Sequence, residues 1–185
     1  MISIKQNIDK YVNTYLKEVK RVIDKATISA TNKTARQAST AAKKAVREKY
    51  TIPAKELNSS TKIQTAKPKR PAAIIRVTGK RLSLGLYRAL QSKKKGASAM
   101  IIKGKRVTIP GDLTLGNKTF KATMKSTYKG IFYRISPKRL KIHERTGPSA
   151  PDLMRSRQST NAVKKYVKDN YERIYASEHK YFKTK

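Results

Sequence analysis

Residues 4–30, IKQNIDKYVNTYLKEVKRVIDKATISA, carry the pattern that decides the first half of the fold. Apolar side chains recur there at steps of three or four, which places them on one face of an amphipathic helix. The stripe thins to Ala and Thr and then resumes, so the sequence predicts a helix over residues 1–50 with a bend or break near 29–32, where helix propensity is weak. The Ala-rich part either packs closely against another helix or chain or is a solvated helix end. The stripe consists of Ile4, Ile8, Tyr11, Tyr15, Val19, Val22, Ala26 and Ala30.

The second half of the chain repeats a helical pattern after a long interval. Polar, proline-containing residues 51–71 predict an exposed connection with one short helical turn at 53–57. Residues 144–160 contain Gly-Pro-Ser-Ala-Pro and predict a turn and loop. From residue 161, apolar side chains again recur at three and four, which predicts a C-terminal helix over 161–182. The order is helix, sheet, helix, so we expect one α+β domain over residues 1–185.

Residues 72–143 predict the sheet, which is small and antiparallel with four or five strands. The segments on either side of Lys103-Gly104-Lys105 are rich in β-branched residues, which is typical of a hairpin, here with a basic tip. A second pair joins residues 119–124 to 130–135. The first of these strands alternates apolar with polar or basic side chains, so we expect one buried face and one wet, basic face.

The composition excludes most enzyme classes. Cys is absent and only two His are present, which removes disulfides, thiolate zinc sites and cysteine nucleophiles and leaves little for a metal or a His-based triad. His143-Glu144 lacks the second His of a zinc-binding helix, and the glycines form no phosphate-binding loop. We therefore expect a non-enzymatic protein with no catalytic residue, metal or cofactor.

Neither a secretion signal nor a membrane span is predicted. The first ten residues carry charges at Lys5, Asp9 and Lys10, and no later stretch approaches 18 uncharged apolar residues. The expectation from the sequence is a soluble protein that is made and folds in the cytoplasm.

The charge is the most unusual property of the chain. Its 45 Lys and Arg against 11 Asp and Glu give a formal net charge of +34. The excess is concentrated in residues 57–143, where 22 basic side chains face one acid, Asp112. Such self-repulsion favours an anionic partner or an assembly with neutralising neighbours. The predicted sheet is therefore the part expected to face anions.

The basic clusters of this region are the candidate contact residues. Lys and Arg neutralise phosphates without reading bases, and no zinc-finger spacing or aromatic RNA-binding strand accompanies them, so sequence-specific recognition is not expected. The alternative is a charged face that meets an acidic protein surface, or only solvent. The candidates are Lys67, Lys69, Arg70, Lys93, Lys94, Lys95, Lys103, Lys105, Arg106, Lys138, Arg139 and Lys141.

Two later segments resemble a known family. Residues 130–134, GIFYR, and 139–151, RLKIHERTGPSAP, are similar to the ending G-x-F-x-R … R-x-P-I-x-x-x-x-G-P-S-x-P of the tailed-phage minor tail protein Z family. Lys141 departs from that pattern, which has Pro before the Ile. Further segments fall in the same order as in the family: the Ala-, Lys- and Arg-rich helix to Tyr50, Ile52–Leu57, and Arg81–Leu84 before Gly96.

This resemblance implies a virion structural protein that completes the head-proximal end of a phage tail. The implied partners are the tail terminator, the head-to-tail connector and the tube. Copies of the chain are implied to form a ring, for which a hexamer is one candidate, and the genome DNA is implied to lie close by. The implied location is the tail or neck of the virion, after assembly in the host cytoplasm. In this reading Gly147, Pro148, Ser149 and Pro151 form a rigid turn before the last helix. The alternative that the charge favours is a free, non-sequence-specific nucleic-acid-binding protein.

Overall fold

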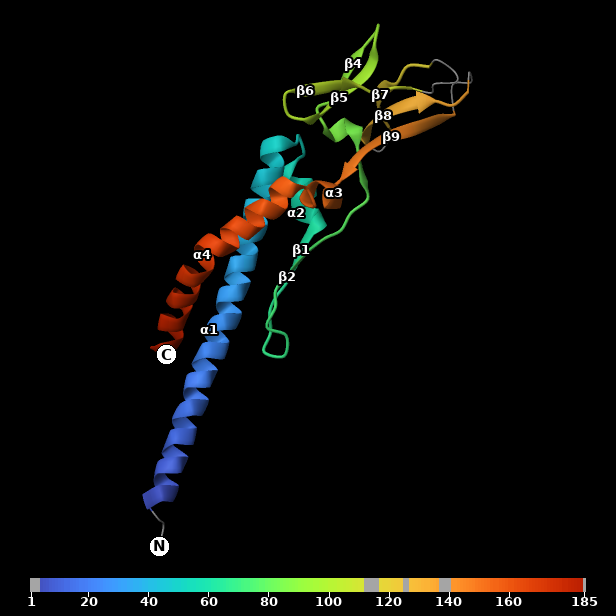
Figure 1. The fold of residues 1–185 in the computed structure, drawn as a ribbon. Helices are drawn as coiled ribbons and strands as arrows, with labels where there is room; N and C mark the ends of the chain where they lie inside the picture. Colours follow the sequence, from blue (N-terminus) through green and yellow to red (C-terminus); the bar gives the residue numbers. More distant parts are fainter. Residues whose placement is uncertain (1–3, 112–116, 125–126, 137–140, 185) are drawn as a thin grey trace. The chain divides into compact units, whose positions relative to one another are not determined.

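The computed structural model describes residues 4–111, 117–124, 127–136 and 141–184 (Figure 1). It has a long N-terminal helix, small antiparallel sheets and a C-terminal helix, so the predicted α+β class is confirmed. The chain divides into two compact units. The helical unit comprises Met1–Thr40, Ile63–Arg76 and Val163–Lys185, and the sheet unit comprises Ala41–Lys62 and Val77–Ala162.

Helix α1 (Ile4–Lys49) continues without interruption through residues 29–32. The predicted break there is wrong. Packing overrides the weak helix propensity, because Ala26, Ala30 and Thr34 are all buried along this part of the helix.

In the helical unit, α1 packs against α4 (Arg157–Lys183), and the two run antiparallel (Figure 1). Gln37 accepts a hydrogen bond from the hydroxyl of Tyr166, whereas Ser29, two turns earlier in α1, meets Glu178 near the end of α4. Ala26, Ala30 and Ala38 are buried along the same part of α1. The Ala-rich part of the stripe is therefore a helix-packing face.

Residues 51–71 are more ordered than the predicted connection. They contain α2 (Ala54–Ser60), whose Leu57 is buried, and β1 (Thr61–Gln64). Strand β1 pairs with β2 (Ile74–Val77) in a two-stranded sheet. Within the helical unit, Asn32 fixes the next part of the segment, because its amide accepts from the Ala66 N–H at 2.7 Å and donates to the Ala66 carbonyl at 3.2 Å.

The sheet unit contains two antiparallel sheets where the sequence predicted one. The four-stranded sheet has the order β3-β9-β8-β7. In it, β7 pairs with β8 with Phe120 opposite Phe132, which confirms the second predicted pair. These strands are β3 (Arg81–Ser83), β7 (Phe120–Thr123), β8 (Lys129–Arg134) and β9 (Ile142–Ser149), and the short 3₁₀ helix η1 (Leu84–Leu86) follows β3.

The three-stranded sheet has the order β4-β5-β6. It consists of β4 (Leu90–Ser92), β5 (Gly96–Ile102) and β6 (Lys105–Thr108). Lys103 and Gly104 join the last two strands, with Gly104 at a φ of 77°, so the predicted hairpin with a basic tip is confirmed.

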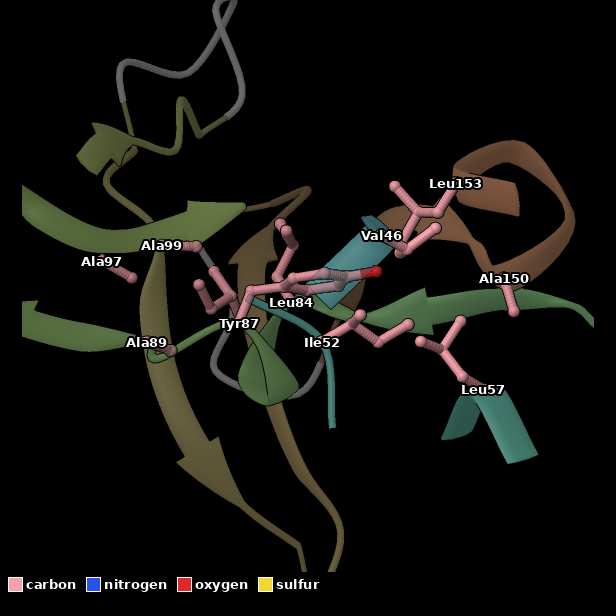
Figure 2. Close-up of a cluster of buried hydrophobic side chains, with 11 residues drawn as sticks. Val46, Ile52, Leu57, Leu84, Tyr87, Ala89, Ala97, Ala99, Ala150 and Leu153 are labelled. Carbon is pink, nitrogen blue, oxygen red and sulfur yellow. The ribbon is translucent and has the colours of Figure 1, made fainter. Parts of the chain in front are cut away.

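The core of the sheet unit lies around Tyr87 (Figure 2). Val46 from α1, Leu57 from α2 and Leu153 from α3 (Ala150–Met154) belong to the same buried cluster. The Tyr87 hydroxyl donates to the Pro148 carbonyl at 2.8 Å, and burial raises the pKa of Tyr87 far above its ordinary value. The hydroxyl therefore remains a protonated donor.

The predicted Gly-Pro turn is wrong, because Gly147, Pro148 and Ser149 lie in β9. A side chain at Gly147 would place its Cβ 2.8 Å from a ring carbon of Tyr87, so the glycine is needed for close packing of the strand. Ser149 then caps α3 through a reciprocal pair of hydrogen bonds with Asp152, and Pro151 lies in the first turn of that helix.

Candidate functional site

The predicted basic residues of the helical unit lie on a tight turn. Backbone hydrogen bonds of 2.9 and 2.8 Å between Lys67 and Arg70 close this turn, and Lys67 and Lys69 are exposed. The guanidinium of Arg70 donates to the Thr65 carbonyl at 2.9 Å, so this cation also supports the turn. Lys67 and Lys69 remain available to an anion.

The predicted residues of the sheet unit form separate groups. Lys93, Lys94 and Lys95 lie between β4 and β5, whereas Lys103 and Lys105 lie at the opposite end of β5. At about 3.3 Å per residue, the two groups are about 26 Å apart.

Three further predicted residues lie outside these two groups. The guanidinium of Arg106 donates to the Arg88 carbonyl at 3.0 Å and so supports the sheet. Lys141 is exposed immediately before β9. Lys138 and Arg139 are outside the described residues.

A hollow of about 290 Å³ lies where α1 ends, and we call it the α1-end hollow. The end of the helix is joined to β5, because Thr51 N–H donates to the Ile101 carbonyl and Lys103 N–H to the Lys49 carbonyl, both at 2.9 Å. No acidic residue is among the described residues that line the hollow, and three of them are cations. They are Arg47, Tyr50, Thr51, Ile52, Pro53, Leu86, Arg88 and Lys103.

Sequence reasoning found only one of these three cations. Lys103 belongs to a visible basic run, but Arg47 is an ordinary basic residue of a helix end and Arg88 is a single cation between apolar residues. The three are brought together by the pairing of the α1 end with β5, which no local pattern indicates. The one structural peculiarity is Arg88, whose φ of 47° is in the left-handed region.

The N-terminal part of α1 carries an apolar surface that no described residue covers. Tyr11 is 77% exposed and Leu16 is 57% exposed. Five residues of α4 follow Glu178, enough to reach about the level of Ala26 on α1, so the stripe beyond that point has no partner helix. We call this surface the open stripe; it consists of Tyr11, Val12, Tyr15, Leu16, Val19 and Ile23.

Glu178 is the one buried acid among the described side chains of the helical unit. Its carboxylate pairs with Lys33 of α1 and accepts from Ser29 Oγ at 2.5 Å. These two hydrogen bonds, that of Lys33 first, lower the pKa of Glu178 below its ordinary value despite the opposing effect of burial. The group therefore stays ionised at neutral pH and joins α1 to α4.

The described residues contain no group of three or more His, Asp or Glu that could hold a metal ion. Among the described helices, none is long and apolar enough to span a membrane. The surfaces that the described chain presents include basic turns, the α1-end hollow and an apolar helix face. Such surfaces bind anions and other proteins.

Comparison with known proteins identifies a family. The chain matches no curated protein and no solved structure. Residues 8–177 match the family model described as prophage minor tail protein Z (GPZ). That match covers most of both helices and all the described strands, and it supports a structural role in the tail and a place in the virion. The chain belongs to the prophage minor tail protein Z family and is a phage minor tail protein.

Proposed function

We propose that this protein is a non-enzymatic tail-completion protein that acts at the head-proximal end of the tail and helps to join it to the head connector. The observation that carries the proposal is the family match over residues 8–177. The open stripe and the basic sheet unit support it, because a joining protein needs one surface for its own kind and another for its neighbours.

In this proposal the open stripe forms the contact between copies of the chain in a ring. Val12, Leu16, Val19 and Ile23 are separated by steps of four, three and four, the spacing of a helix seam that packs against another helix. Residues 11–25 hold four bases and two acids, so like-charge repulsion is far weaker here than in residues 57–143. Two copies can therefore approach through this surface at a small electrostatic cost.

The exposed lysines of the sheet unit form the second proposed surface. Lys93, Lys94 and Lys95 make no ion pair with a described residue and lie on a turn, where a partner can reach them. They supply attraction to genome DNA or to acidic neck proteins, and the other exposed candidates add to it. This contact is proposed to be electrostatic and hence sensitive to salt.

Quantitative mass spectrometry of purified virions and isolated tails tests the proposal. We expect a small, fixed copy number relative to the connector proteins, as a symmetric ring requires. Absence of the chain from particles, together with its recovery on cellular nucleic acid, would favour the alternative of a free nucleic-acid-binding protein.

Charge reversal tests the basic surface. Replacing Lys93, Lys94 and Lys95 by Glu should leave folding intact, because exposed side chains contribute little to it, but should increase the fraction of unjoined heads and tails in electron micrographs. The matched control reverses Lys164, Lys165 and Lys168, three exposed lysines of α4. Normal joining by the first variant would contradict the role of these lysines.

A further inference from the structure

We propose that the α1-end hollow is a binding site for a phosphate group of the nucleic-acid backbone. Its three cations come from separate segments: Arg47 from the last turn of α1, Arg88 from the loop before β4, and Lys103 from the tip of the β5–β6 hairpin. All three side chains are exposed, and none makes an ion pair or a hydrogen bond with a described residue. The fold therefore brings three free positive charges to one concave surface.

The arrangement suits a phosphate better than a carboxylate. A backbone phosphate is tetrahedral, and its negative charge is shared by two non-bridging oxygens that point in different directions, so cations at separate points of a rim can reach both. A single carboxylate is planar and is satisfied by one bidentate arginine. The lining also includes Tyr50, Ile52 and Leu86, which offer apolar surface to the sugar that a backbone phosphate carries.

Thr51 adds an unused donor at the same place. Its hydroxyl oxygen is shielded from solvent and has no hydrogen-bond partner among the described residues, although Thr51 lines the hollow. Buried polar groups are usually hydrogen-bonded. A phosphate oxygen in the hollow would supply the missing acceptor.

The backbone at Arg88 is the independent observation. Its φ of 47° is strained for any residue other than glycine. Such conformations persist where the surrounding structure holds them, and they are found most often at functional sites. Here the preceding Tyr87 carbonyl accepts from Met100 N–H at 2.8 Å, and the Arg88 carbonyl accepts from Arg106. An arginine is therefore held in a conformation suited to glycine, with its side chain at the hollow.

The inference rests on the proposed function, in which the basic sheet unit contacts DNA or acidic neck proteins. For the α1-end hollow it selects DNA as the ligand. A phosphate of a DNA strand is favoured over a free phosphate ion, because further exposed cations lie on both sides of the hollow. Lys105 follows the hairpin tip, and Lys49 precedes Tyr50. Neighbouring phosphates of one strand can occupy these positions together. Incorporation into virions does not depend on the hollow, so the two proposals can fail separately.

The experiment compares two variants of the full-length protein that have the same net charge. One replaces Arg47, Arg88 and Lys103 by Gln, and the control replaces Lys164, Lys165 and Lys168 of α4 by Gln. Binding of a fluorescent 20-base-pair duplex of arbitrary sequence is measured by anisotropy over a series of salt concentrations. Inorganic phosphate is tested as a separate ligand in the same buffer.

We expect the hollow variant to bind the duplex at least roughly tenfold more weakly than the wild type. Its slope of log affinity against log salt should fall by about one to three, since each phosphate contact contributes about 0.9. The control should change less than about threefold. Equal losses in the two variants would mean that only net charge matters and would overturn the proposal. The proposal would also be overturned if the wild type bound inorganic phosphate saturably and the hollow variant lost that binding but kept its affinity for the duplex.

The variant Arg88→Gly separates binding from folding. Glycine adopts the left-handed conformation freely, so the melting temperature should not fall, while duplex affinity should drop several-fold. Unchanged affinity in this folded variant would show that the conformation of Arg88 serves the fold only. Normal incorporation of either variant into particles would leave the tail-completion proposal standing whatever happens to DNA binding.

Discussion

The two parts of α1 in the helical unit show opposite relations between side-chain size and burial. From Ala26 to Ala38 the stripe consists mainly of small residues, and they are buried; Ala30 is 0% exposed. From Tyr11 to Ile23 it consists of large apolar residues, and they are exposed. One continuous face of one helix is thus covered where its side chains are small and open where they are large.

The difference follows from what each part packs against. Small side chains let two helix axes approach closely, and α4 of the same chain is present to do so. Large side chains remove more apolar area from water when they are covered, but α4 ends before it reaches them. The first part is therefore suited to packing within the chain, and the second to packing between molecules.

Enlarging a buried alanine should have the largest effect on stability. Ala30→Leu places a large side chain in the closely packed part, and the overpacking should lower the free energy of unfolding by about 3 kcal/mol. Urea denaturation measures the change. Leu16→Ala in the open stripe is the control and should cost less than about 0.5 kcal/mol. Equal effects at the two positions would remove the distinction between the two parts of the helix.

Removing the charge of Glu178 should have an intermediate effect that depends on pH. Because Lys33 and Ser29 lower the pKa of this carboxyl in the folded state, its ionisation stabilises the fold at pH values above the ordinary value of 4.5, and the contribution is lost as pH falls through the lower folded-state pKa. Glu178→Gln should therefore lower the free energy of unfolding by about 2 kcal/mol at pH 7. The difference from the wild type should shrink steadily below about pH 4.5.

Denaturation of both proteins between pH 7 and pH 3 checks this prediction. All other acids are the same in both proteins, so the comparison isolates Glu178. A difference that stays constant down to pH 3 would contradict the stabilising role of the ionised pair between α1 and α4.

Polar substitutions in the open stripe should have the smallest effect on the stability of the single chain. Leu16→Gln combined with Val19→Gln keeps good helix formers at exposed positions, so the free energy of unfolding should change by no more than about 0.5 kcal/mol. Self-association should nevertheless weaken, which sedimentation equilibrium at several protein concentrations would detect. An unchanged distribution of species would contradict the proposed contact between copies.

Periodic segments were predictable because local pattern determines them. The spacing of Val163, Tyr166 and Val167 predicted α4, although the helix begins at Arg157, and the alternation after Phe120 predicted the pairing of β7 with β8. The stripe of α1 was also correct as a pattern. The pattern does not show where the partner helix α4 ends along α1, so the exposure of Tyr11 and its neighbours was not predictable.

Features that depend on distant contacts were missed for a physical reason. Gly147 looks like a turn glycine, but it lies in β9, and the position needs glycine because the ring of Tyr87, sixty positions earlier, leaves no space for a Cβ. Leu57 lies in a polar stretch that reads as a connection, yet it joins the same buried cluster as Val46 and Leu153. The cations of the α1-end hollow are likewise brought together only by the contact of α1 with β5.

The pairing of α1 with α4 also has a consequence for synthesis on the ribosome. Ser29 and Glu178 are 149 positions apart, so at about 5 to 20 residues per second the first helix waits roughly 7 to 30 s for its partner. During that time both the Ala-rich face and the open stripe of α1 are uncovered. A chain that stops before α4 lacks the helix that covers the Ala-rich face, so it cannot complete the helical unit.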